Sequence, residues 1–122
     1  MNKKLFGQGW ELSVFQCDTG LTLSIPVDMG HWSRSFHFEI VEADLEALQA
    51  SGLRHKVLEF VLHERLQRRM AGGDYQNVDE EIRPVIQAIL HGSDGDLIHQ
   101  VSVSPDPGFI RYRLMKAGLE MD

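Results

Sequence analysis

Three side chains near the middle of the chain, His55, Glu59 and His63, have the types and the spacing of metal ligands. They recur at intervals of four, so on a helix they lie on successive turns of one face. The helical rise separates the two histidines by roughly 12 Å, which is too far for both to reach one ion unaided. The residues after His63 also lack the second histidine of the zinc-protease pattern HExxH. We therefore predict a solvated helix face here, with no metal and no cofactor.

The other candidates for chemistry are dispersed. His31, with Asp28 three residues earlier, has the composition of a general base and its orienting carboxylate, but the glycine between them argues against a fixed geometry. His99 lies among alternating apolar residues, which predicts a hydrogen-bonded core histidine on a strand. Cys17 has no second cysteine to pair with, which favours a reducing cytoplasmic compartment. No nucleophile elbow, phosphate-binding glycine loop or cysteine cluster is present, so we predict that the protein is not an enzyme.

Length and charge limit the function classes. The 122 residues predict a single domain over 1–122, large enough to fold without disulfides or metals. A formal net charge of −6 argues against general nucleic-acid binding, which needs a basic surface for the phosphates. No run approaches the roughly twenty apolar residues of a membrane span, and the N-terminus has no apolar segment typical of a signal peptide. We therefore predict a cytoplasmic protein that binds neither nucleic acid nor membrane.

The first 41 residues predict three strands. Residues 10–14 and 21–25 alternate between apolar and polar, and the turn at residues 18–20 predicts a hairpin. Pro26 is expected to limit further pairing of the second strand. A third strand, at residues 34–41, is expected to pair with the second, since sequence neighbours usually pair. The predicted inward face of the hairpin consists of Trp10, Leu12, Val14, Leu21, Leu23 and Ile25.

After residue 41 the apolar residues recur at the intervals typical of helices. Residues 42–50 predict a short helix with acids in its first turns, and residues 53–70 predict a longer one that ends at the glycines 72 and 73. Asn77 followed by Glu80 resembles a capping box, so a third helix is expected over 78–90, disturbed by Pro84. Alternation over 97–103 and 109–115, separated by a proline turn, predicts a second hairpin.

These elements together predict an α+β fold. The expected order is β-β-β-α-α-α-β-β, with an antiparallel sheet of about five strands and the helices packed on one face.

The charges along the chain are segregated. Residues 11–51 contain seven acids and one arginine, whereas residues 54–69 contain five basic residues and two acids. Residues 74–96 contain six acids and only Arg83. Helix ends account for part of this pattern, because the helix dipole favours acids at the N-terminus and bases at the C-terminus. We predict that the remainder attracts a basic protein partner, and that the binding residues are Asp74, Asp79, Glu80, Glu81, Asp94 and Asp96.

Three segments of this small acidic chain carry a family resemblance: Phe36-His37-Phe38-Glu39-Ile40, then Asp44-Leu45-Glu46-Ala47-Leu48, and then Val57-Leu58-Glu59-Phe60-Val61-Leu62-His63. In this order they resemble small bacterial immunity proteins of contact-dependent inhibition and related polymorphic toxin systems. The resemblance covers about a quarter of the chain and contains no shared catalytic motif. It implies a non-enzymatic protein that binds a cognate basic toxin domain, often a nuclease, and blocks it.

Two other readings stay open. One is a small enzyme or ligand-binding domain with a pocket between sheet and helices, using His31, His37 or His99 as the polar group. The other is a homodimeric adaptor domain that pairs through an edge strand or through the Leu66 and Met70 side of the long helix.

Overall fold

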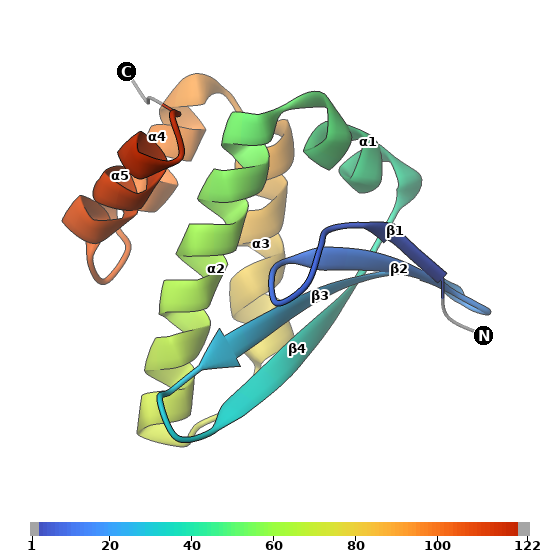
Figure 1. The fold of residues 1–122 in the computed structure, drawn as a ribbon, viewed down its shortest axis with the longest axis horizontal. Helices are drawn as coiled ribbons and strands as arrows, with labels where there is room; N and C mark the ends of the chain where they lie inside the picture. The colour runs from blue at the N-terminus through green and yellow to red at the C-terminus, as the bar shows by residue number, and fades with distance from the viewer. Residues whose placement is uncertain (1–2, 120–122) are drawn as a thin grey trace.

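The computed structural model describes residues 3–119, which form a four-stranded sheet followed by five helices (Figure 1). The predicted α+β class is confirmed, but the predicted counts of five strands and three helices are wrong. The elements are β1 Lys3–Phe6, β2 Ser13–Cys17, β3 Gly20–Asp28, β4 Ser33–Ile40, α1 Glu42–Ala50, α2 Gly52–Gly72, α3 Val78–His91, α4 Asp94–Ser102 and α5 Pro107–Lys116. The single-domain prediction extends to Met1, Asn2 and residues 120–122, which lie outside the described residues.

The sheet is antiparallel, with its strands in sequence order. The predicted pairing of the second and third strands is confirmed as β3 with β4, in a register that places Leu23 opposite Phe38. The first predicted strand is shifted along the chain, because β2 begins only at Ser13, and Trp10 is 67% exposed instead of facing inward. Strand β1 was not predicted, since its four residues Lys-Lys-Leu-Phe do not alternate.

Pro26 ends one ladder of β3 and leaves the other intact. Pairing with β2 stops at Ser24, two residues before the proline, as its missing N–H requires. Pairing with β4 continues past it, with Pro26 opposite Ser35 and Asp28 opposite Ser33. The expected limit therefore applies to one side of the strand only.

The first three helices follow the predicted segments. The Ser51 side chain accepts a hydrogen bond from Arg54 N (3.1 Å) and so caps α2, and α2 ends at Gly73, whose φ of 68° suits glycine. Helix α3 begins at Val78 as predicted, but Asn77 is left-handed and its side chain makes no capping bond. Pro84 lies inside α3, which continues through it.

The predicted second hairpin is wrong, because both of its segments are helices. Leu97 and Val101 are four residues apart and become buried neighbours on α4, and Ile110 and Leu114 do the same on α5. Both helices have side-chain caps: Ser93 and Asp96 exchange hydrogen bonds at the start of α4, and Asp106 accepts one from Phe109 N before α5. His99 therefore lies exposed on a helix and not on an apolar strand face.

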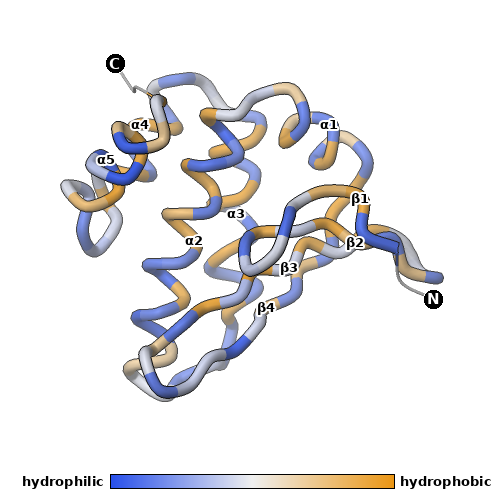
Figure 2. The backbone as a smooth tube through the Cα atoms, in the orientation of Figure 1, coloured by the Kyte–Doolittle hydropathy of each residue, from blue (hydrophilic) through white to orange (hydrophobic). Residues whose placement is uncertain are grey.

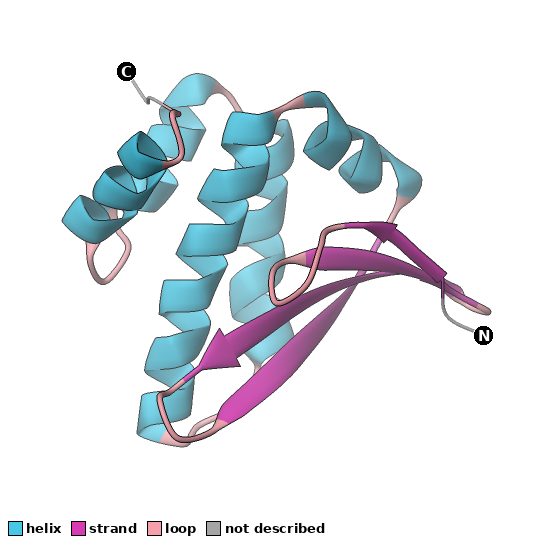
Figure 3. Ribbon diagram, viewed as in Figure 1, coloured by secondary structure: helices cyan, strands magenta, loops and turns pink. Residues whose placement is uncertain are grey.

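Helix α2 occupies the centre of the molecule (Figure 3). It contacts β3 and each of the other four helices. Figure 2 shows hydrophobic and hydrophilic positions alternating along the chain, as expected when each element buries one side. In the described residues no helix has the length and apolar character needed to cross a membrane. Fully buried α2 side chains include Val57, Leu58, Val61, Leu62 and Leu66.

One buried carboxylate joins α1 to α3. Asp44 is 2% exposed; its Oδ2 accepts a hydrogen bond from Val41 N (3.0 Å), and its Oδ1 lies 2.6 Å from His91 Nε2 and 3.2 Å from Gln87 Nε2. Burial alone raises the pKa of Asp44, but these three contacts outweigh it and hold the pKa below its usual value. The folded state therefore favours the ionised carboxylate.

We expect Asp44→Asn to lower the free energy of unfolding by about 1–3 kcal/mol at neutral pH, because it removes a charge-assisted acceptor from a buried site. Since the folded pKa of Asp44 is depressed, the wild-type advantage is present above pH 4 and falls as the pH drops through the folded pKa. Urea denaturation between pH 2 and 7 measures both effects. If the difference in the free energy of unfolding between wild type and Asp44→Asn does not shrink at acidic pH, the ionised carboxylate does not have this role.

Candidate functional site

The six acids predicted to bind a partner form two groups at opposite ends of α3. Asp74, Asp79, Glu80 and Glu81 lie around its first turn, whereas Asp94 and Asp96 follow its last residue. A helix of 14 residues is roughly 20 Å long. The six carboxylates therefore do not form one continuous patch.

Arginines neutralise most of the first group. Arg69, near the end of α2, donates from Nε to Glu81 Oε1 (2.6 Å), and its Nη1 lies 3.8 Å from Asp74 Oδ2. Arg83 makes two hydrogen bonds to Asp79, of 3.1 and 3.0 Å, from one turn further along α3. Only Glu80 of this group has no ion pair within residues 3–119.

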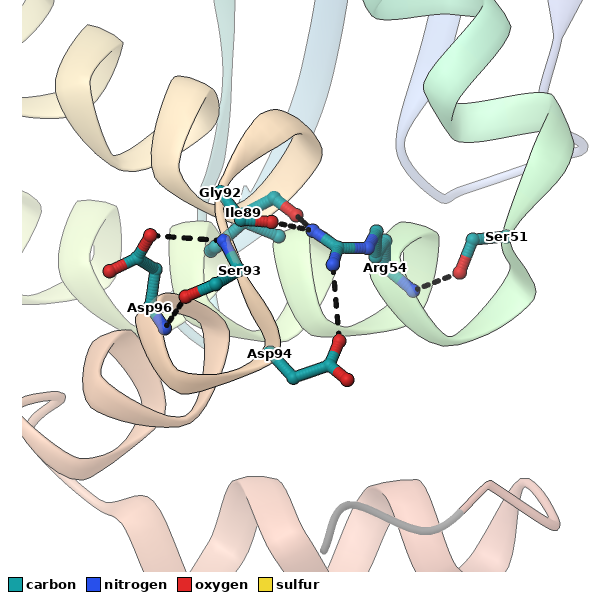
Figure 4. A network of polar contacts seen from close by, with 7 residues as sticks. All are labelled: Ser51, Arg54, Ile89, Gly92, Ser93, Asp94 and Asp96. Atoms are coloured by element: carbon teal, nitrogen blue, oxygen red, sulfur yellow. Dashed lines mark hydrogen bonds and ion pairs between the residues drawn. The ribbon is translucent and has the colours of Figure 1, made fainter.

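The second group serves the ends of helices (Figure 4). Arg54 Nη1 donates to the carbonyl oxygens of Ile89 (2.8 Å) and Gly92 (2.9 Å) at the end of α3, and Arg54 Nη2 lies 3.2 Å from Asp94 Oδ1. Asp96 Oδ2 accepts from Ser93 N (3.0 Å) as part of the α4 cap. Both carboxylates thus have a structural role.

The premise that these side chains are unpaired is therefore wrong for Asp74, Asp79, Glu81 and Asp94. The pairing of Asp79 with Arg83 was readable from the i, i+4 spacing. The pairing of Asp74 and Glu81 with Arg69 needed the antiparallel packing of α2 and α3 seen in Figure 1. That the six residues bind a partner stays a prediction, with weaker physical support.

A different acidic surface has no such neutralisation. Glu42 and Glu46 are exposed on α1, beside Val41, whose side chain is 63% exposed. Neither carboxylate has an ion pair within residues 3–119. We call Val41, Glu42 and Glu46 the α1 face. Glu39 adjoins it, and the neighbouring Arg83 is committed to Asp79 and to the Glu39 carbonyl.

A second candidate is the outer edge of β4, the last strand of the sheet. A hollow of about 260 Å³ runs along this edge, bounded on its other side by the start of α3 and the connection that precedes it. Of the three histidines proposed for a ligand site, His37 lines this hollow, His31 is exposed in the β3–β4 turn and His99 is exposed on α4. The three therefore do not share a site. The hollow is lined by Arg34, Ser35, Phe36, His37, Phe38, Tyr75, Val78 and Asp79.

A larger hollow of about 490 Å³ lies between α2 and the α4–α5 connection. Sequence reasoning missed its buried carboxylate, Glu64, whose Oε1 accepts from Asp106 N (2.9 Å). Burial raises the pKa of Glu64, and burial together with the charge of Arg113 lowers the pKa of His63. Both side chains line the hollow, and both are pushed toward their neutral forms. Arg68 and Phe109 also line it.

The candidate metal ligands His55, Glu59 and His63 make other contacts, and the helix face predicted to be solvated is partly buried, with the Glu59 side chain 12% exposed. Glu59 Oε2 accepts from Leu12 N (3.3 Å) and its Oε1 from Lys56 Nζ (3.0 Å). The His55 ring packs edge-on against Phe6, with 4.7 Å between ring centroids, and burial lowers its pKa. Across residues 3–119, no cluster of three His, Cys, Asp or Glu side chains has the arrangement of a metal site.

Comparison with known proteins identifies no relative, since no family model, curated protein or solved structure matches the chain.

We expect the free energy of unfolding of Glu64→Gln, minus that of wild type, to increase as the pH rises from 4 to 8. The raised pKa means that the folded state binds the Glu64 proton more tightly than the unfolded state, so wild-type stability falls as this group ionises. The amide keeps an oxygen for Asp106 N. Urea denaturation across this range measures the trend, and its direction should be opposite to that of Asp44→Asn. A parallel trend in the two variants would contradict the assignment.

Proposed function

We propose that this chain is a non-enzymatic protein-binding domain of the immunity type, which neutralises a basic toxin domain by covering it with the α1 face. The observation that carries the proposal is the exposed pair Glu42 and Glu46 beside exposed Val41, without an ion-pair partner in the described part of the chain. An exposed apolar side chain flanked by carboxylates corresponds to the apolar centre and polar rim of a protein interface, and the carboxylates favour a basic partner.

The electrostatic layout supports a basic partner. Most acids of the α2–α3 region form ion pairs with Arg54, Arg69 and Arg83. The net charge of −6 therefore comes mainly from carboxylates that have no such ion pair. Unpaired carboxylates on one side of a molecule accelerate encounter with a cationic surface and orient it. Glu39 and Glu80 add to this field from either side of Arg83.

Ligand binding is the second candidate, and one feature favours it. The hollow of about 490 Å³ has a volume within the usual range of small-molecule sites and is lined by the convergent polar groups His63, Glu64 and Arg68. It differs from the pocket expected from the sequence, because none of His31, His37 and His99 lines it.

Co-expression with the product of the adjacent reading frame tests the immunity function. We expect that product to arrest growth alone, and the chain to restore growth and to co-purify with it in equal amount. Growth arrest that the chain does not relieve would overturn the proposal. Binding without protection would reduce it to a protein-binding domain.

We expect Glu42→Lys and Glu46→Lys, singly, to slow association with this partner by about tenfold at low salt and to leave the fold intact, because exposed charges act mainly on the association rate. Asp28→Lys is the charge control, since it makes the same change of net charge beside the start of β4, roughly 26 Å away. Because Asp28 Oδ1 accepts a hydrogen bond from Gly30 N (2.8 Å), circular dichroism and urea denaturation first check that this variant is folded. Surface plasmon resonance at two salt concentrations measures the rates. Equal effects of all three substitutions would exclude the α1 face as the contact.

A further inference from the structure

The backbone of β4 carries a row of hydrogen-bonding groups that point away from the sheet. Glu39 O accepts from Arg83 Nη1 (2.8 Å), which lies outside the sheet, so the peptide groups of Glu39 point away from β3. Along a strand, the peptide groups of successive residues point to opposite sides, so every second residue points the same way. The N–H and C=O groups of Ser33, Ser35 and His37 therefore point outward, as those of Glu39 do. Pro26 agrees with this phase, because it lies opposite Ser35 and needs no N–H at that position.

The two edges of the sheet differ in how they are protected. Strand β1 is four residues long, carries Lys3 and Lys4, and has a register irregularity after Lys4. Short length, lysines and bulges all discourage pairing with another strand. Strand β4 has eight residues and neither a lysine, a proline nor a register irregularity, and among the described residues its one recorded outward hydrogen bond is from Arg83 to the Glu39 carbonyl.

The β4 edge is also electrically polarised along its length. Arg34 lies at one end of the edge hollow, with its guanidinium carbon 4.1 Å from the Tyr75 ring centroid, and Asp79 lines the same hollow. Asp79 forms an ion pair with Arg83, and Arg83 also donates a hydrogen bond to the carbonyl oxygen of Glu39 near the other end of β4. The two carboxylates of Glu39 and Asp79 outnumber the single guanidinium of Arg83, so the edge runs from the positive charge of Arg34 to a net charge of −1.

We infer that β4 pairs antiparallel with β4 of a second copy of this chain, about a two-fold axis, so that one sheet continues through both copies. Reversing the polarised edge brings Arg34 of each copy toward the net negative group of Glu39, Asp79 and Arg83 in the other, twice by symmetry. Placing the axis at Phe36 sets Ser35 opposite His37 of the second copy, with their outward N–H and C=O groups in hydrogen-bonding pairs. The inference uses a surface other than the α1 face and does not depend on the proposed function.

A proline substitution isolates the backbone contribution. Ser35→Pro removes one outward N–H per copy and leaves pairing with β3 available, whereas Ser35→Ala keeps the N–H and is the matched control. By sedimentation equilibrium we expect the wild-type mass to rise from 13.9 kDa toward twice that value with concentration. We expect Ser35→Pro to weaken association roughly ten- to hundredfold and Ser35→Ala to leave it within about twofold.

A charge exchange tests the register without changing the backbone. We expect Arg34→Asp and Asp79→Arg each to weaken dimerisation, and the double variant to recover much of the loss, because it restores opposite charges across the axis. Hydrogen exchange adds a second readout: the Ser35 and His37 amides should become slower to exchange as wild-type concentration rises.

A monomer up to millimolar concentration overturns the inference, as does a dimer indifferent to both Ser35→Pro and the charge exchange. Should Ser35→Pro fail to fold, the charge exchange and the amide readout decide alone. If wild type stays monomeric while a lysine-rich extended peptide slows the same two amides, the edge serves a foreign strand and the second-copy assignment is wrong.

Discussion

The structure depends on the burial of helix α2 on nearly all sides. Its stripe of Val57, Leu58, Val61, Leu62 and Leu66 is too wide for a single neighbour, so the helix must be covered by the sheet and by other helices. Burial of apolar surface at roughly 25 cal/mol per Å² supplies the main driving force for this arrangement. The later helices α4 and α5 complete the cover on the side that the sheet does not reach.

Polar contacts then fix how the covering elements are placed. Arg54 joins the start of α2 to the end of α3, and Arg69 joins the end of α2 to the start of α3. Asp44 joins α1 to α3. Each of these side chains satisfies groups that helix ends or burial would otherwise leave unpaired. Most of the acids around α3 therefore hold the fold together, whereas Glu42 and Glu46 on α1 have no ion pair within residues 3–119.

The same accounting of hydrogen bonds distinguishes the two edges of the sheet. Backbone groups on an edge strand can pair only with solvent, with a side chain or with another strand. At β1 the chain is short and basic, whereas at β4 a row of peptide groups faces a hollow bordered by Tyr75 and Asp79. Hydrogen bonds from such a row require a partner backbone in a fixed direction, whereas the α1 face presents the exposed Val41 and two carboxylates without such a requirement.

Much of the fold was readable from local pattern. The hairpin around the turn at residues 18–20, the strand at Phe36 and Phe38, and the helix boundaries at Ser51 and Gly73 follow from periodicity and capping, which act within a few residues. The segment from Leu97 to Val103 was misread, because Leu97 and Val101 fit a period of two as well as a separation of four. The cap formed by Ser93 and Asp96 resolves the ambiguity in favour of a helix.

The sequence by itself determined the α+β class, the charge balance and the lack of a recognisable catalytic motif, because each depends on composition or on contacts between near neighbours. The tertiary structure alone decided which carboxylates are neutralised, since Arg69 and Arg54 meet their partners only when α2 packs against α3. It also decided which strand edge stays open, because the direction of a peptide group is known only once its partner strand is known.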